Sequence, residues 1–311
     1  MKGATGNGRR WALDALVVLA VAVPFGPLVL QALADRWQGR ALVPQALGWR
    51  GIRLAADDPI LVRAVGASLA VGAVVAALAV IVAWPAARYL AQTRSRVGWA
   101  LLASPLLMPP LVLGDGLAAW LPAIGLAGGY AAIVVAHLPG SIAYAALALV
   151  PAFGPELDEL DASAAVLGAS PVRRLAGIIV PAVRRHLMLA LALAFTVSWS
   201  QYGTSLTVGG GRPMLPLVLV PFVRRDPQVA AVLSLAFLVP PALSLVVAAR
   251  AGGHRRDRRR AARAEAPIAA RGESTPPNTV IIATTAERVQ PSESGPREGA
   301  GDGPGRFHRP F

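Results

Sequence analysis

The sequence predicts an all-α integral membrane protein with about six transmembrane helices, on the evidence of its composition and the length of its apolar segments. Of its 311 residues, 55% are hydrophobic and only 15% are charged, whereas soluble domains are about a quarter charged. The mean hydropathy is +0.53. Residues 64–87 and 187–211 contain no charged side chain. Blocks of about 18 or more apolar residues are long enough to cross a bilayer as helices.

The predicted transmembrane helices follow one another along residues 1–250. By the length criterion they are residues 11–33, 64–87, 97–120, 129–150, 187–208 and 229–249. We expect the first to be retained, because no small-residue cleavage site follows it. Proline is tolerated in a span where neighbouring groups satisfy the freed carbonyls. The third helix is interrupted by Pro105, Pro109, Pro110 and Asp115.

Composition divides the chain into two regions. Residues 1–250 hold all the long apolar blocks and are predicted to form one transmembrane domain. Residues 251–311 are dominated by Arg, Pro, Gly, Ser and Glu, and such a segment buries too little apolar surface to offset the entropy of ordering. We therefore expect residues 251–311 to be a disordered basic tail.

The distribution of positive charge predicts the orientation of the chain. The net charge is +13, and arginine and lysine favour the cytoplasmic side of a membrane. With an even number of spans, one face receives Lys2, Arg9, Arg10, Arg88, Arg94, Arg96, Arg173, Arg174, Arg184, Arg185 and the basic run 255–260. We expect a multi-pass protein of the plasma (inner) membrane with cytoplasmic N- and C-termini. The positive charge is then explained by membrane topology and by contact with the lipid bilayer, and we expect no binding of nucleic acid. The loops on the opposite face also carry arginines.

The segment between the fourth and fifth predicted spans carries the signals of a short surface helix. Gly154-Pro155 is typical of a helix start, and carboxylates in the first turn favour the positive end of the helix dipole. Gly168 suits the left-handed residue that ends a helix, and Ser170 begins a second one as its N-cap. One apolar stripe is predicted along the first helix, formed by Leu157, Leu160, Ala164 and Leu167. From periodicity alone, this helix lies on the membrane surface and packs on the protein's own spans.

The same segment resembles the signature loop of permease subunits of binding-protein-dependent ABC importers. Ala164 and Gly168 match the pattern of that loop, and the spacing from the glycine leads to Ile178. Val180-Pro181 stands for its Leu-Pro end. The chain departs from the pattern at the usual acidic position, which is Ala162, and at the first alanine, which is Ser163. Asp161, one residue earlier, supplies a carboxylate instead.

The resemblance extends to other stretches between residues 60 and 250. Residues 106–114 resemble the proline-broken third span of the family, and Ala136-His137 with Tyr144 resembles its fourth. Residues 201–206, followed by the three glycines 209–211, resemble the end of its fifth span. This glycine-rich end is most similar to permeases for thiamine, ferric iron, polyamines or inorganic oxyanions.

The resemblance implies a type I permease that works by alternating access. In that family the loop is a coupling helix, which docks on a separate ATPase subunit whose closure rocks the spans. The residues placed in the coupling loop are Leu160, Asp161, Ser163, Ala164, Gly168, Ala169, Ser170, Ile178 and Pro181. The implied partners are ABC ATPase subunits, a second permease subunit forming a homo- or heterodimer, and an extracytoplasmic substrate-binding protein.

A translocation path is expected near the bilayer midplane, where broken helices and sparse polar groups meet. The fifth predicted span is the richest in polar side chains, and His137 is an ionisable residue inside the fourth. The candidate path residues are His137, Ser198, Ser200, Gln201 and Tyr202. Hydrogen bonding between helices is an equal explanation for the hydroxyl groups, and a neutral packing histidine is the alternative role of His137.

Other chemistry has little support in the sequence. The chain has no cysteine, and its one lysine, Lys2, lies in no P-loop pattern, so we expect no ATP hydrolysis, enzyme activity or cofactor. The histidines form no pair at metal-binding spacing. An ion-coupled secondary transporter is the alternative function, with Asp115 as its carboxylate. An intramembrane aspartyl enzyme would need a second buried carboxylate, for which Asp14 is the only other candidate within a span.

Overall fold

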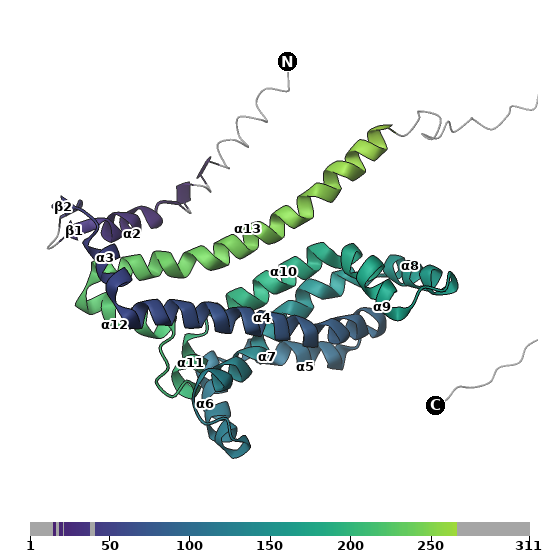
Figure 1. Cartoon of the computed structure of the whole chain (residues 1–311), viewed down its shortest axis with the longest axis horizontal. Coiled ribbons are helices and arrows are strands. Elements are labelled where there is room, and N and C mark those ends of the chain that lie inside the picture. Colours follow the sequence, from purple (N-terminus) through teal and green to yellow (C-terminus); the bar gives the residue numbers. More distant parts are fainter. Residues whose placement is uncertain (1–14, 17–18, 21, 38–40, 266–311) are drawn as a thin grey trace, which may run out of the picture. The chain divides into compact units, whose positions relative to one another are not determined.

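The structure is a computed structural model that describes residues 15–265 except 17–18, 21 and 38–40, with side chains described as far as residue 251. The described residues are mainly helical (Figure 1). Much of the first predicted span, 11–33, lies outside them, and its described part includes α2, Phe25–Ala32. Residues 266–311 of the predicted tail also lie outside the described residues, whereas residues 251–265, expected to be disordered, are the end of helix α13, Pro227–Glu265.

Four described helical segments are long and apolar enough to cross a membrane. They are α4, Pro59–Thr93; α7, Tyr130–Leu149, with the short 3-10 turn η2, Val150–Ala152; the run Pro171–Trp199; and residues Pro227–Ala251 of α13, Pro227–Glu265. A bent pair of helices makes a fifth span if it is counted as one. The described residues thus account for four or five spans, and the first predicted span, 11–33, and with it the total of six, stays a prediction.

The third predicted span, 97–120, is not a continuous helix. It consists of α5, Arg96–Leu107, and α6, Pro110–Trp120, whose directions differ by 97°. Met108 and Pro109 between them have extended backbone. A proline disfavours helical geometry in the residue before it and donates no backbone hydrogen bond. Pro109-Pro110 therefore ends one helix and begins another, and the 3-10 turn η1, Leu121–Ile124, follows.

The fifth predicted span, 187–208, is wrong at both ends. The helical run starts with α9, Pro171–Arg174, continues through the π-helix η3, Leu175–Ile179, and becomes α10, Val180–Trp199. Pro181 has no N–H to donate to the carbonyl of Gly177, and the wider π-turn lies directly before it. Beyond Ser200 and Gln201 the chain forms a separate short helix, α11, Tyr202–Val208.

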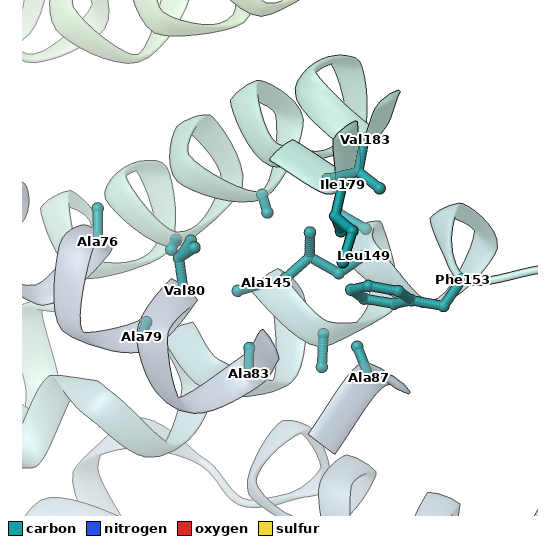
Figure 2. Close-up of a cluster of buried hydrophobic side chains, with 14 of the residues drawn as sticks. Ala76, Ala79, Val80, Ala83, Ala87, Ala145, Leu149, Phe153, Ile179 and Val183 are labelled. Carbon is teal, nitrogen blue, oxygen red and sulfur yellow. The ribbon is translucent and has the colours of Figure 1, made fainter. Parts of the chain in front are cut away.

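The core of the membrane domain is built by α4, α7 and α10, which pack against one another. Small side chains repeat along α4 at Ala76, Ala79, Ala83 and Ala87, all buried. Figure 2 shows Val80 and these alanines beside Ala145 and Leu149 of α7, with Ile179 and Val183 in the same cluster. Because alanine lets helix backbones approach closely, van der Waals packing holds the three helices together.

The ends of the helices away from α8 carry the remaining described elements. Two short antiparallel strands, β1 (Ala34–Arg36) and β2 (Ala46–Leu47), depart from the all-α prediction. Helix α3, Arg50–Asp57, follows them, and α12, Leu215–Arg225, precedes α13. Arg50 connects these elements, because its guanidinium lies 2.7 Å from the Asp226 carboxylate and its backbone N–H donates to Asp35 at 2.9 Å.

Candidate functional site

The loop between α7 and α10 contains the short helix α8, Pro155–Val166, where the sequence predicted one. The helix ends as predicted at Gly168, whose φ of +80° is a conformation that favours glycine. The backbone N–H of Gly168 donates to Ala165, and that of Ala169 donates to Ala164, both at 3.0 Å. These two bonds form a Schellman motif, which satisfies carbonyls that the helix end would leave free.

The residues after this turn join the loop to the next span. The hydroxyl of Ser170 accepts a 3.4 Å hydrogen bond from the backbone N–H of Arg173 and caps α9, as predicted. Ile178 lies half-buried in the π-helix, and Pro181 lies in the first turn of α10. Ser163 is exposed, and its hydroxyl donates to the carbonyl of Glu159 at 2.8 Å.

The predicted apolar stripe of α8 is divided between two faces. Leu157 and Ala164 are buried, and Leu157 belongs to the alanine-rich core cluster. Leu160 is 54% exposed and Leu167 is 86% exposed. Together with other exposed side chains they form what we call the exposed loop face: Leu160, Val166, Leu167 and Val172. One side of α8 is thus anchored on the spans, and the other side presents apolar groups without a partner in the described chain.

The acidic residue of the loop, Asp161, forms ion pairs with arginines of the same chain. The carboxylate of Asp161 lies 3.4 Å from the guanidinium of Arg88 in α4 and 3.1 Å from that of Arg174 in α9. Arg174 also donates to the backbone carbonyl of Asp161 at 3.3 Å. Asp158 lies 3.5 Å from Arg88. The side chain of Asp161 is only 15% exposed, so it faces the spans rather than solvent. Arg88 was counted in the sequence only as a topology signal.

A second group of polar residues lies where α7, α10 and α11 meet. His137 of α7 is fully buried, with Nδ1 2.9 Å from the Ser198 hydroxyl and Nε2 3.0 Å from the Ser205 hydroxyl. Ser205 donates its single proton to the carbonyl of Gln201 at 2.5 Å. A hydroxyl has one proton to give, so Ser205 accepts from Nε2–H of His137, and Nδ1 accepts from Ser198. All of the hydrogen bonds are then satisfied by a neutral histidine.

The structure brings together only some of the predicted path residues. His137, Ser198 and Gln201 belong to the buried cluster, whereas Ser200 is exposed and bonds to Val197, and Tyr202 is 40% exposed. Two members were missed from the sequence. Ser205 bonds to His137, and Thr204 donates to the side chain of Gln201 at 3.1 Å. Their helical spacing from Gln201 was the signal that could have identified them.

Close backbone contact fixes α11 against α6. A Cβ atom placed on Gly203 would lie 2.8 Å from the backbone nitrogen of Leu111, closer than real Cβ atoms approach. A Cβ on Gly114 would collide with the Thr207 hydroxyl. Glycine at these two positions therefore lets the two short helices cross at the break of each span.

Two carboxylates were considered for other mechanisms, Asp115 and Asp14. Asp115 is exposed on α6, and Asp14 lies outside the described residues. Within residues 15–265, apart from the gaps, no group of three or more His, Cys, Asp or Glu side chains could hold a metal ion.

Comparison with known proteins agrees with this fold. No protein-family model matches the chain. It is 30% identical over 185 residues to the molybdenum transport system permease protein ModB of Mycobacterium bovis and, equally, to that of Mycobacterium tuberculosis, covering 53% of this chain and 70% of each relative. A bacterial ABC transporter involved in the import of the acidic polysaccharide alginate has a similar fold, with a TM-score of 0.50 and 13% identity over 80% of this chain and 96% of that one.

Broken apolar helices and an exposed loop helix define a subunit of a membrane transporter, and the multi-pass architecture belongs in the plasma membrane. The chain belongs to the family of permease subunits of binding-protein-dependent ABC importers.

Proposed function

We propose that α8 is the coupling helix of this permease and that the exposed loop face binds a cleft on a separate ABC ATPase subunit. The proposal is carried by one observation: α8 is anchored through Leu157 and Asp161, while Leu160, Val166 and Leu167 are left exposed. Neighbouring apolar side chains that are exposed on the surface of a protein mark interaction sites. ATP-driven closure of the ATPase pair would move α8 and switch the spans between inward- and outward-facing states.

The rest of the assembly follows from the same proposal. The permease acts with a second permease copy or homologue, two ATPase subunits and an extracytoplasmic substrate-binding protein, and does not hydrolyse ATP itself. The loop face then lies in the cytoplasm, together with both termini. We also propose the division into a membrane domain, 1–250, and a cytoplasmic tail, 251–311.

We place the translocation path beside the buried polar cluster, at the break between α10 and α11. The cluster contains hydroxyl, imidazole and amide groups but no carboxylate. Its members are His137, Ser198, Gln201, Thr204 and Ser205. Exposed Ser200 and Tyr202 lie next to it along the chain. A path beside a cluster that contains no carboxylate suits an anion, because no negative charge there would repel it. The names of the two mycobacterial relatives, which are molybdenum transport permeases, support an inorganic oxyanion such as molybdate as the substrate.

The coupling proposal is tested by capture of the ATPase from mild detergent. Leu167→Arg places a charge at a side chain that is 86% exposed, so it changes the exposed loop face without disturbing the core. Leu42→Arg is the matched control, because Leu42 is 92% exposed on the segment between β1 and β2. We expect the ATPase to accompany the wild-type protein and the Leu42 variant and to be lost from the Leu167 variant. Equal capture by both variants would contradict the proposal.

The substrate is tested separately in proteoliposomes that contain the permease, its ATPase and its binding protein. ATP-dependent accumulation of labelled molybdate, blocked by excess tungstate, is the expected result. Full ATPase capture without molybdate uptake would overturn the substrate class and leave the coupling proposal intact.

A further inference from the structure

Four charged side chains from three separate helices form a cluster that holds α8 against the spans. They are Arg88 of α4, Asp158 and Asp161 of α8, and Arg174 of α9, and we call them the loop clamp. All three ion pairs are between 3.1 and 3.5 Å long. Two cations face two anions, so the cluster is electrically balanced.

Asp161 is the centre of the loop clamp. It is paired with both arginines, and its side chain is 15% exposed, compared with 43% for Asp158. Isolated ion pairs on a surface contribute little, whereas partly buried charges in a network are screened less by solvent and salt. Removing one partner of such a pair leaves an uncompensated charge and costs more than the pair itself contributes.

Hydrogen bonding within the loop clamp is incomplete. Asp161 Oδ1 and Arg174 Nε are buried but have no hydrogen-bond partner, although Oδ1 lies 3.1 Å from the Arg174 guanidinium. The attraction there is therefore mainly between charges, without the directional bonds that would fix a single geometry. Arg88 makes polar contacts from α4 to two residues of α8, at 3.4 Å to Asp161 and at 3.5 Å to Asp158, and the contact with Asp161 is also a hydrogen bond.

The contact between Arg88 and Asp161 joins two helices that are far apart in the sequence. Helix α8 is joined to α10 through the backbone of α9 and η3, so any movement of α8 reaches α10 along the chain. Helix α4 has no such connection, because Arg88 and Asp161 are 73 residues apart. Helix α4 packs on α7 and α10, and the ion pairs of Arg88 with Asp158 and Asp161 add a direct link from α4 to α8.

We propose that Arg88 and Asp161 are positioning residues that transmit movement of α8 to α4. The proposal rests on the proposed role of α8 as the coupling helix. The two arginines then have different roles: Arg174 holds α8 to its own span, and Arg88 makes α4 move with it. Loss of Arg88 should leave the ATPase bound but separate its hydrolysis from transport.

The absence of cysteine from the chain allows a direct test. Arg88→Cys and Asp161→Cys are combined and studied in the complex with the ATPase and binding protein, before and after joining the two thiols with a short bifunctional reagent. Molybdate is the transport probe. Before cross-linking we expect a several-fold fall in the molybdate transported per ATP hydrolysed, measured on the complexes that have captured the ATPase. Cross-linking should restore most of the ratio, because it replaces the lost link.

Two results would overturn the proposal. An unchanged transport ratio in the double variant would show that α4 does not need the link. Loss of transport on cross-linking would show that the contact must open during the cycle. Arg88→Lys should keep the amount of molybdate transported per ATP, and Arg88→Gln should lower it. This comparison distinguishes the effect of the positive charge from a general effect on folding. Arg173→Gln is the matched control, since Arg173 is exposed on α9 and belongs to no ion pair among the described side chains.

Failure of the link between Arg88 and Asp161 can be told apart from failure of the proposed function. If the wild-type chain captures no ATPase, the coupling role of α8 fails. If it captures the ATPase without moving molybdate, the substrate class fails, and the hydrolysis rate becomes the measurement. Cross-linking must then return the rate of the double variant to that of the wild type, and an unchanged rate would refute the link.

Discussion

Trp199 of α10 donates its indole N–H to the backbone carbonyl of Phe237 in α13, over 2.8 Å. In a regular helix that carbonyl would accept from residue 241, but residue 241 is a proline and has no N–H. The Trp199 ring also packs against those of Phe195 and Phe237, with centroids 5.7 and 5.8 Å away. The side chain of one span thus satisfies a backbone group that a proline leaves free in another.

Trp199→Phe should therefore weaken the contact between α10 and α13. The hydrogen bond is lost while an aromatic ring stays. We expect the free energy of unfolding to fall by about 1 kcal/mol for the hydrogen bond, and further because the phenyl ring packs less surface than the indole. Thermal unfolding in detergent measures it. Trp84→Phe is the control for ring size, because Trp84 packs edge-on against Phe153 at 5.2 Å and donates no hydrogen bond within the described residues. Equal losses of stability in the two variants would contradict the role of the indole N–H.

Gly203→Ala should disrupt the crossing of α11 and α6. The added Cβ would lie 2.8 Å from the nitrogen of Leu111, which is backbone and cannot rotate away, so we expect a loss of roughly 1–3 kcal/mol and of transport. Gly116→Ala on α6 meets nothing within 4 Å and should be neutral or stabilising. Comparison of their unfolding temperatures and transport rates tests the packing. Normal behaviour of the Gly203 variant would show that the two helices do not need close contact.

Asp226→Asn should destabilise the protein in a pH-dependent manner. Burial raises the pKa of Asp226, but the hydrogen bonds and charge of Arg50 and the backbone N–H of Val229 hold it below its ordinary value of 3.8. A carboxyl whose pKa is lowered on folding stabilises the protein above its unfolded pKa and loses that effect as the pH falls. The wild type should thus be more stable than the variant at pH 7.

That advantage should shrink as the pH falls below about 4, because the carboxylate of the unfolded chain is protonated there before that of the folded protein, whose pKa is lower. Thermal unfolding of both proteins between pH 7 and pH 3 measures the difference. Asp57→Asn is the control, since Asp57 is exposed at the end of α3 and belongs to no ion pair among the described residues. A difference that stays constant over this range would refute the contribution of the ion pair.

Asp115→Asn distinguishes the permease from an ion-coupled transporter. An ion-coupled mechanism requires the carboxylate, so its loss would abolish uptake. We expect ATP-dependent uptake of molybdate to be maintained, because Asp115 is exposed on α6 and belongs neither to the loop clamp nor to the buried polar cluster. Uptake driven by ATP and by an imposed ion gradient is measured for both proteins. Loss of uptake in the variant would favour the ion-coupled alternative.

Local signals predicted the loop between α7 and α10 well. Gly154-Pro155 starts α8, Gly168 ends it with a positive φ, and Ser170 caps α9. Each of these features depends on the conformational preference of one residue and on neighbours within a few positions. They can therefore be predicted without knowledge of the rest of the fold. The same segment carried the family resemblance, which the mycobacterial relatives confirm.

Features that depend on distant residues were not predictable in this way. Periodicity indicated one apolar stripe on α8, but packing buries Leu157 and exposes Leu167. Prolines marked an interruption in the third span, while the 97° bend depends on what α6 packs against. Nothing near Asp161 in the sequence indicates Arg88, and nothing near His137 indicates Ser198 and Ser205.

The sequence by itself predicted that this chain is helical, crosses the membrane several times and resembles the permease subunits of ABC importers. Apolar length, helix-ending residues and short motifs are sufficient for these conclusions, because each is a property of a continuous segment. The tertiary structure decided which face of α8 is free, where Asp161 points and how the broken spans meet. These depend on pairs of residues that only folding brings into contact, such as Arg88 with Asp161 and Trp199 with Phe237.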